Sequence, residues 1–183
     1  MKTLILNGSP RKDGDTATLL NEFREHVLGE VVEISAYRDS ISACIDCRSC
    51  WKVRGCALKD DMAKIYADDY DVLLIASPVY MYNLPGPMMS LASRFQVYYA
   101  ASRFLNDPIV RNKKKASLIL VAGGNGGAWP AIESAKLMFK TLNADFDDIN
   151  LVTSLKTDTI PAKDDPDALK KVREMAIRLN ESF

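Results

Sequence analysis

The chain has 183 residues, of which 48% are hydrophobic, and this is enough for one compact domain whose core needs no covalent cross-links. Its 24 lysine and arginine residues balance its 24 aspartate and glutamate residues, so the formal net charge is zero. A protein that binds the nucleic-acid backbone needs a basic surface. We therefore expect a single domain over residues 1–183 and no nucleic-acid partner.

The apolar segments of the sequence are short. The first, Thr3-Leu4-Ile5-Leu6, is not the longer apolar region of a signal peptide, and no other run approaches the roughly 18 residues of a membrane span. We expect a cytoplasmic protein without membrane contact. In a reducing compartment, four cysteines crowded between Cys44 and Cys56 indicate metal binding or redox chemistry rather than structural disulfides.

Short apolar runs alternate with longer segments of helical period, as in βα units around a buried parallel sheet. We predict strands at Lys2–Leu6, Val31–Ser35, Val72–Ser77, Ser117–Ala122 and Asp148–Val152. We predict helices at Thr16–Val27, Pro87–Phe104, Ala131–Leu142 and after the cap Asp165-Pro166. This set of elements suits an open doubly wound sheet and is too small for an eight-fold barrel.

The first predicted strand is followed by the loop Asn7–Thr16, which leads into a helix N-terminus. Free N–H groups and the positive end of the helix dipole suit a phosphate there, while Ser9 and Thr16 supply hydroxyls and Arg11 a positive charge. Because the loop has neither Gly-Lys-Ser/Thr nor G-x-G-x-x-G, a monophosphate site fits best. The alternative is an ordinary strand-to-helix turn capped by Asp15.

The segment after the second strand has the spacing C-x2-C-x2-C-x5-C, formed by Cys44, Cys47, Cys50 and Cys56. Cubane iron-sulfur clusters are held by four thiolates, and C-x2-C-x2-C recurs in their ligation. Zinc more usually takes two well-separated C-x2-C pairs, so zinc is a less favoured choice. Free thiols or an incidental disulfide remain open, because spacing does not report metal loading.

Two further loops follow strands and suit a flavin. Ser77–Asn83 offers backbone N–H groups, an amide and tyrosine rings, although these tyrosines could also simply pack. Gly123–Gly127 has few side-chain atoms to obstruct an approaching ring. The alternative is a flexible surface loop, which would carry the same glycines. Trp129 is suited either to covering a flavin or nicotinamide or to anchoring its helix in the core. In open α/β sheets such loops gather at the carboxyl edge, where ligands bind.

These motifs resemble the NADPH-dependent FMN reductase family of flavodoxin-like proteins. The resemblance rests on Asn7-Gly8-Ser9-Pro10-Arg11 with Gly14 and Thr16, Asp60-Asp61-Met62, Ser77-Pro78-Val79-Tyr80 and Gly123-Gly124. It implies a three-layer α/β fold with an open five-stranded parallel sheet of order 2-1-3-4-5 and helices on both faces. The cysteines resemble those of the iron-sulfur flavoprotein branch, in which a 4Fe-4S cluster relays electrons to FMN, although some relatives carry them with no evident cluster.

The resemblance also implies the residues that hold each group. The FMN phosphate would be bound by Ser9, Arg11, Thr16 and Ala17. The isoalloxazine ring would be lined by Pro78, Val79, Tyr80, Tyr82 and Asn83, and flanked on its other edge by Gly123, Gly124 and Gly127. A cluster would be bound by Cys44, Cys47, Cys50 and Cys56. Asp15 departs from the family's usual asparagine or serine, so we expect its carboxylate to point away from the phosphate as a helix cap.

The expected function is an enzyme that oxidises NADH or NADPH through FMN and passes electrons to a quinone, flavin, nitro or azo compound, or exchanges them with a redox protein through the cluster. No catalytic acid–base residue is expected, because the flavin performs the chemistry. The alternatives are a flavodoxin-like or iron-sulfur electron carrier, against which the zero net charge argues mildly, and an iron-sulfur sensor with a vestigial flavin.

The helix predicted at Pro87–Phe104 carries more apolar residues than one face of a sheet needs. They serve either the core of the chain or a subunit interface. The family resemblance implies a homodimer or a dimer of dimers with FMN near the boundary. If the interface includes Tyr98 and Tyr99, their substitution by serine should give monomers.

Overall fold

A computed structural model describes residues 1–110 and 112–183. Its strands form one parallel sheet in the order β2-β1-β3-β4-β5, which confirms the predicted order. The strands are β1 (Lys2–Asn7), β2 (Glu30–Ser35), β3 (Val72–Pro78), β4 (Lys114–Ala122) and β5 (Ala144–Leu155). All five predicted strands are present at these places.

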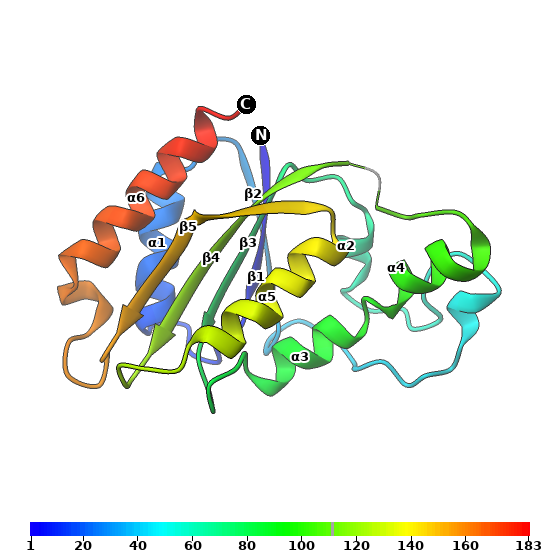
Figure 1. Cartoon of the computed structure of the whole chain (residues 1–183), viewed down its shortest axis with the longest axis horizontal. Coiled ribbons are helices and arrows are strands. Elements are labelled where there is room, and N and C mark those ends of the chain that lie inside the picture. Colours follow the sequence, from blue (N-terminus) through cyan, green and yellow to red (C-terminus); the bar gives the residue numbers. More distant parts are fainter. Residues whose placement is uncertain (111) are drawn as a thin grey trace.

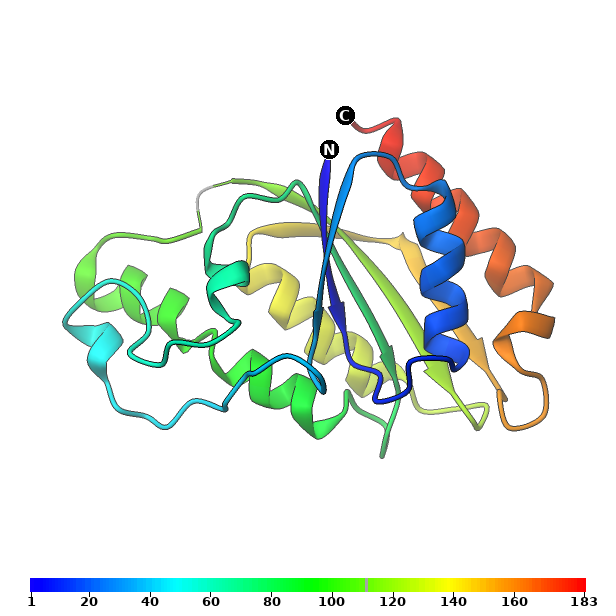
Figure 2. The ribbon, with the colours of Figure 1, turned by 180° about the vertical axis from the view of Figure 1, so that it is seen from behind.

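Helices cover both faces of the sheet, and this gives the expected three layers (Figures 1 and 2). One face is covered by α1 (Asp15–His26) and α6 (Pro166–Asn180). The other carries α2 (Ala63–Tyr66), α3 (Gly86–Ser93), α4 (Gln96–Ala100) and α5 (Trp129–Thr141). Side chains of a strand alternate between its two faces, so in β1 Leu4 and Leu6 enter the core under α3 and α5, while Ile5 enters the core under α1 and α6.

Two strands, β4 and β5, begin several residues earlier than predicted. In β4 the first residue, Lys114, is buried and forms an ion pair with Asp68, with Nζ 2.5 Å from Oδ1. In β5 the pairing jumps from Phe146 opposite Ala116 to Leu151 opposite Leu118, so the strand is bulged. A buried lysine and a bulge both break the apolar pattern that reveals a strand in the sequence.

The predicted helix Pro87–Phe104 is not continuous. It is divided into α3, α4 and a π-helical turn over Ala101–Leu105. Most of its apolar residues are buried in the core of the chain itself: Met88, Leu91, Phe95, Val97 and Tyr98. Tyr99 is 57% exposed. The excess of apolar residues therefore mainly serves the intrachain core, which includes Tyr98, so of the two alternatives for these residues the structure favours the core.

The last helix begins as predicted, because the Asp165 carboxylate accepts a hydrogen bond from the backbone N–H of Ala168. Among the described residues, none of the helices is both long and apolar enough to cross a membrane.

Candidate functional site

The loop after β1 lies at the lower edge of the sheet in Figures 1 and 2, where the strands end. Ser9 is buried, and its backbone N–H donates to Asn7 Oδ1 at 2.8 Å. The Ser9 hydroxyl oxygen accepts from the Arg11 N–H at 3.3 Å, which turns the chain toward α1. Arg11 is exposed, Thr16 is buried and Ala17 is partly buried. The loop thus places the four predicted phosphate residues around the start of α1.

The N-terminus of α1 has no side-chain cap among the described residues. The N-cap is Gly14, not Asp15, so the prediction that Asp15 caps the helix is wrong. Asp15 Oδ1 instead accepts from the backbone N–H of Ala162 at 2.9 Å and joins α1 to the segment before α6. The carboxylate is therefore held by another segment, and first-turn N–H groups of α1 are left for an anion.

An arginine that the sequence did not single out supports this loop. Arg38 Nη1 donates to the carbonyl oxygen of Ser9 at 3.2 Å, and Arg38 Nη2 lies 3.0 Å from Glu33 Oε1. The same Glu33 oxygen accepts from Asn7 Nδ2 at 2.9 Å. The pattern was not visible in the sequence because these residues come together only when β2 pairs with β1.

The loop after β3 forms a tight turn in which Tyr80 and Asn83 exchange backbone hydrogen bonds of 2.9 and 3.0 Å. Met81 and Tyr82 have φ values of 47° and 66°, a left-handed backbone that non-glycine residues adopt rarely and often at functional sites. Their side chains are 90% and 62% exposed. Asn83 Oδ1 accepts from Leu84 N–H and from Ser134 Oγ, so its amide nitrogen remains the group available to donate.

The glycine loop after β4 packs directly against other parts of this edge. A Cβ on Gly123 would lie 2.4 Å from an Asp158 carboxylate oxygen, and a Cβ on Gly127 would lie 2.0 Å from the Tyr82 ring. Gly124 accepts the Lys156 N–H at 2.8 Å. Gly127, whose φ is 80°, is thus required by its backbone conformation and by the Tyr82 ring, whereas at Gly123 the Asp158 side chain could move aside. Trp129 is 71% exposed, so it does not anchor its helix in the core.

The cysteine segment leaves the carboxyl end of β2 and lies beside α4 in both views (Figures 1 and 2). Trp51 stacks on Phe104 with ring centroids 4.4 Å apart, and Arg54 Nη1 lies 2.5 Å from Asp107 Oδ2. The four cysteines are free thiols that line one cavity, together with Trp51, Leu58, Arg94 and Val97 among others. Burial raises the pKa of the Cys50 thiol, and the other three cysteines raise it further.

Within residues 1–110 and 112–183, no group of three or more His, Cys, Asp or Glu side chains is arranged to hold a single metal ion. The thiols thus border a common cavity without converging on one point.

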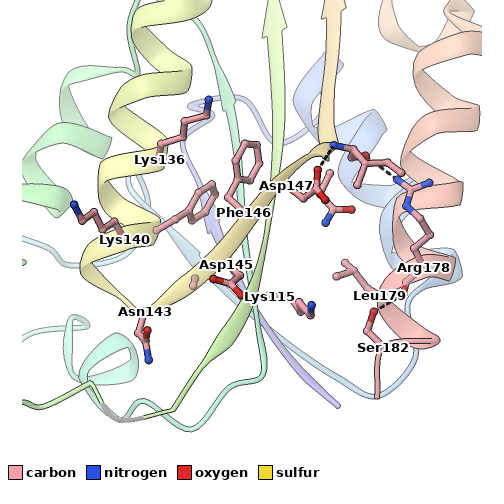
Figure 3. A pocket seen from close by; sticks show the side chains of 14 residues that line it. Lys115, Lys136, Lys140, Asn143, Asp145, Phe146, Asp147, Arg178, Leu179 and Ser182 are labelled. Carbon is pink, nitrogen blue, oxygen red and sulfur yellow. Dashed lines mark hydrogen bonds between the residues drawn. The ribbon is translucent and has the colours of Figure 1, made fainter.

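A cavity of about 970 Å³ lies at the opposite edge of the sheet, where β4 and β5 begin (Figure 3). Lys136 and Lys140 of α5, Asp145 of β5 and Arg178 of α6 surround it. Arg178 Nη2 already donates to the backbone oxygen of Ile149 at 2.8 Å. Ligands of open α/β sheets bind at the carboxyl edge, so this cavity is not assigned to the cofactor.

The chain is similar to known proteins over the part that contains the loops described above. A family model for NADPH-dependent FMN reductases matches residues 1–146. An iron-sulfur flavoprotein of Methanocaldococcus jannaschii is 31% identical over 133 residues, which cover 69% of this chain and only 65% of that relative. An iron-sulfur flavoprotein of Archaeoglobus fulgidus is 24% identical over 188 residues, covering 100% of this chain and 80% of that relative.

Solved structures share the fold. An FMN-dependent NADH-azoreductase from Bacillus anthracis, in complex with FMN, superposes with a TM-score of 0.70 at 18% identity and covers 98% of this chain and 100% of that one. The family match extends over most of the chain and includes the loops after β1, β3 and β4. This chain belongs to the NADPH-dependent FMN reductase family.

Proposed function

We propose that this protein binds FMN at the carboxyl edge of its sheet and oxidises NADH or NADPH, passing the electrons to a small acceptor such as a quinone, flavin, nitro or azo compound. The observation that carries the proposal is the meeting of three loops at one edge, with a helix start that no side chain of the described residues caps and an exposed aromatic turn. The family match and the fold shared with an azoreductase support it.

In this proposal the loop after β1 binds the FMN phosphate. The Ser9 and Thr16 hydroxyls and the backbone N–H of Ala17 donate hydrogen bonds, and Arg11 supplies the charge. Asp15 does not oppose the phosphate, because its carboxylate is held by Ala162. Arg38 fixes the Ser9 carbonyl and so orients the loop.

The other two loops bind the ring. Pro78, Val79, Tyr80, Tyr82 and Asn83 would line the isoalloxazine, and Gly123, Gly124 and Gly127 would flank its far edge. FMN, when bound, supplies the redox chemistry by accepting and releasing electrons. The chain contributes a flat apolar wall, backbone donors and the Asn83 amide, whose oxygen already accepts two hydrogen bonds and whose nitrogen is left to donate.

Titration of the apo-protein with FMN, followed by quenching of flavin fluorescence, tests the site. Arg11→Gln should raise the Kd about tenfold, because a charge-assisted bond to phosphate is worth roughly 1.5–3 kcal/mol. Lys12→Gln is the matched control, since Lys12 is an exposed cation of the same loop with no assigned role and should change the Kd little. Equal effects of both substitutions would mean that the loop attracts FMN only by overall charge.

Anaerobic mixing with NADH or NADPH distinguishes the enzyme from an electron carrier. An enzyme should lose its visible flavin absorbance within seconds and regain it on addition of an azo dye or quinone. A carrier would stay oxidised with both nucleotides and be reduced only by a redox protein.

We further propose that Cys44, Cys47, Cys50 and Cys56 bind a 4Fe-4S cluster that exchanges electrons with the flavin or with a redox protein. A cubane presents four iron corners, so its ligands surround a volume instead of converging on one ion. Four thiols that border one cavity suit that need, and the relatives named iron-sulfur flavoproteins support the proposal.

Anaerobic purification followed by assays of iron, acid-labile sulfide and flavin tests the cluster. We expect about four irons and four sulfides per chain. Cys50→Ser should lower both while leaving the FMN content unchanged, and Ala43→Ser, an exposed change in the same segment, should lower neither. Flavin without iron in the wild-type protein would contradict the cluster and mean that the four cysteines are ordinary thiols.

We also propose a homodimer that buries the exposed apolar side chains near the ring site, among them Met81 and Trp129. Sedimentation should report twice the mass of the chain. Met81→Glu should shift the protein toward the monomer, because it would place a charge in the proposed interface. A monomeric wild-type protein would rule the interface out.

A further inference from the structure

Arg94 lies just after α3, and its side chain is only 1% exposed. Its guanidinium faces the Asp60 carboxylate through both terminal nitrogens, with Nη1 2.5 Å from Oδ2 and Nη2 3.2 Å from Oδ1. Burial acts to lower the pKa of Arg94, but the hydrogen bond to Asp60 and the nearby charges of Tyr66, Cys56 and Asp60 together outweigh it, so the pKa of Arg94 is raised. The pair is therefore ionised in the folded protein.

The same guanidinium binds both ends of the cysteine segment. Nη1 donates to the carbonyl oxygen of Ser42 at 2.9 Å, and Nη2 makes a longer contact of 3.5 Å with that of Leu58. Ser42 stands two residues before the first cysteine and Leu58 two residues after the last. Asp60 adds to the closure by accepting the Ser42 N–H at 3.3 Å.

The third guanidinium nitrogen of Arg94, Nε, makes no such hydrogen bond. Nε is buried and has no hydrogen-bond partner among the described residues. A buried N–H without an acceptor is costly and rare in folded proteins. Arg94 also lines the cavity that the four cysteines border. An acceptor in that cavity within hydrogen-bonding distance of Nε would satisfy this donor.

Arg94 is also the buried positive charge of the cavity. The other charged residues that line it, Asp46 and Arg48, have side chains 76% and 60% exposed and lie 3.5 Å from each other. Their charges are screened by water, whereas that of Arg94 is not. Four thiolates and their cluster carry net negative charge, which a buried guanidinium offsets.

We propose that Arg94 is the positioning residue of the iron-sulfur site: it closes the cysteine segment through Ser42 and Leu58 and directs its Nε–H and its charge to the sulfur atoms in the cavity. This inference rests on the proposed cluster. Hydrogen bonds to sulfur and positive charge stabilise the reduced cluster and raise its reduction potential. The negative charge of Asp60, which is paired with Arg94, lowers the reduction potential instead.

Redox titrations of the anaerobically purified protein, followed by electron paramagnetic resonance, test the role of Arg94. Arg94→Lys keeps the charge but loses Nε and the two-pronged geometry, so the midpoint potential of the cluster should fall. Asp60→Asn keeps Nε and removes a negative charge, so the potential should rise. Arg54→Gln breaks an exposed ion pair of the same segment and should leave the potential unchanged.

The opposite shifts in potential expected for Arg94→Lys and Asp60→Asn distinguish a direct role of Arg94 at the cluster from a purely structural one. If Arg94 merely held the segment, both variants would loosen it and shift the potential in the same direction, and this result would overturn the proposal. An unchanged potential in Arg94→Lys would overturn it as well. FMN content serves as the check that each variant is folded.

Failure of the cluster itself gives a different result. A wild-type protein without iron and sulfide would overturn the cluster and the role of Nε together. The closure of the segment would then be judged by thiol labelling with an aromatic disulfide: Arg94→Lys should expose the cysteines to faster reaction, and Arg54→Gln should not.

Discussion

Single charged residues connect segments that lie far apart in the sequence. Arg94 with Asp60 and Lys114 with Asp68 are buried pairs whose closest atoms are 2.5 Å apart. Removing one partner of such a pair leaves a buried charge and costs about 3–5 kcal/mol. Neither pair was recognisable in the sequence, because its members are brought together by the strands and helices between them.

The ion pair between Arg94 and Asp60 makes the free energy of unfolding depend on pH. Burial acts to raise the pKa of Asp60, but hydrogen bonds from Arg94 and from the N–H groups of Ser42 and Met62 outweigh it and lower the pKa. The stability that Asp60 contributes is therefore complete above its unfolded pKa of about 3.9 and is lost as the pH falls through the lower folded value. We expect Asp60→Asn to be less stable at pH 7 and to lose less stability than the wild type between about pH 5 and pH 3. Thermal unfolding across that range measures the difference, and parallel curves would contradict the expectation.

Gly127 is the glycine with the most specific requirement. Its φ is 80°, and a Cβ would meet the Tyr82 ring at 2.0 Å. Gly127→Ala should cost about 1–3 kcal/mol of stability and displace Tyr82, and under the proposed function this displacement should weaken FMN binding. Gly126→Ala is the control, because a Cβ there would have open space. Thermal unfolding and FMN titration of both variants check this, and a Gly127→Ala protein as stable as Gly126→Ala would show that the turn can rearrange.

Secondary structure elements followed their sequence patterns where local signals were strong. The helices α1, α5 and α6 begin within a few residues of the predicted positions, and α6 starts at the expected cap. The segment from Pro87 to Phe104 did not remain one helix. Arg94, at its break, is held by contacts with Ser42, Leu58 and Asp60, which helical periodicity does not report.

The cap of α6 gives a prediction at the level of an element. Asp165 accepts from the Ala168 N–H through Oδ1 and from Ser154 Oγ through Oδ2. Asp165→Ala should lower stability by about 1–2 kcal/mol, because both donors lose their acceptor. The neighbouring exposed Asp164→Ala should have little effect. Chemical denaturation measures both, and equal losses would mean that general charge, not the cap, stabilises the helix.

At the scale of the whole molecule, the candidate site is built from loops that only the parallel sheet brings together. Those after β1, β3 and β4 meet at one edge because neighbouring parallel strands end there. The cysteine segment leaves the same edge from β2 and is packed against α4 and the turn that follows it. The layered arrangement thus brings the loops proposed to hold the flavin and the cysteine segment to the same edge of the sheet.

Two neighbouring tyrosines test which apolar residues belong to the core. Tyr98 is buried and donates to the Ile65 carbonyl oxygen at 3.4 Å, whereas Tyr99 is exposed. Tyr98→Ser should destabilise the protein by about 3–5 kcal/mol, as does the loss of other large buried side chains. Tyr99→Ser should leave the unfolding temperature nearly unchanged. The reverse order in thermal unfolding would contradict the assigned core.

The amino-acid sequence by itself determined the fold class, the strand positions and the loops that carry the candidate site, because apolar periodicity, helix caps and phosphate-loop chemistry are local properties. Only the tertiary structure decided that Asp15 binds Ala162, that Tyr98 is buried within its own chain, and that Arg94 closes the cysteine segment. These outcomes depend on which distant groups a side chain meets after the sheet has formed. The spacing of residues along the chain does not report which charges pair or which side chains are buried between elements.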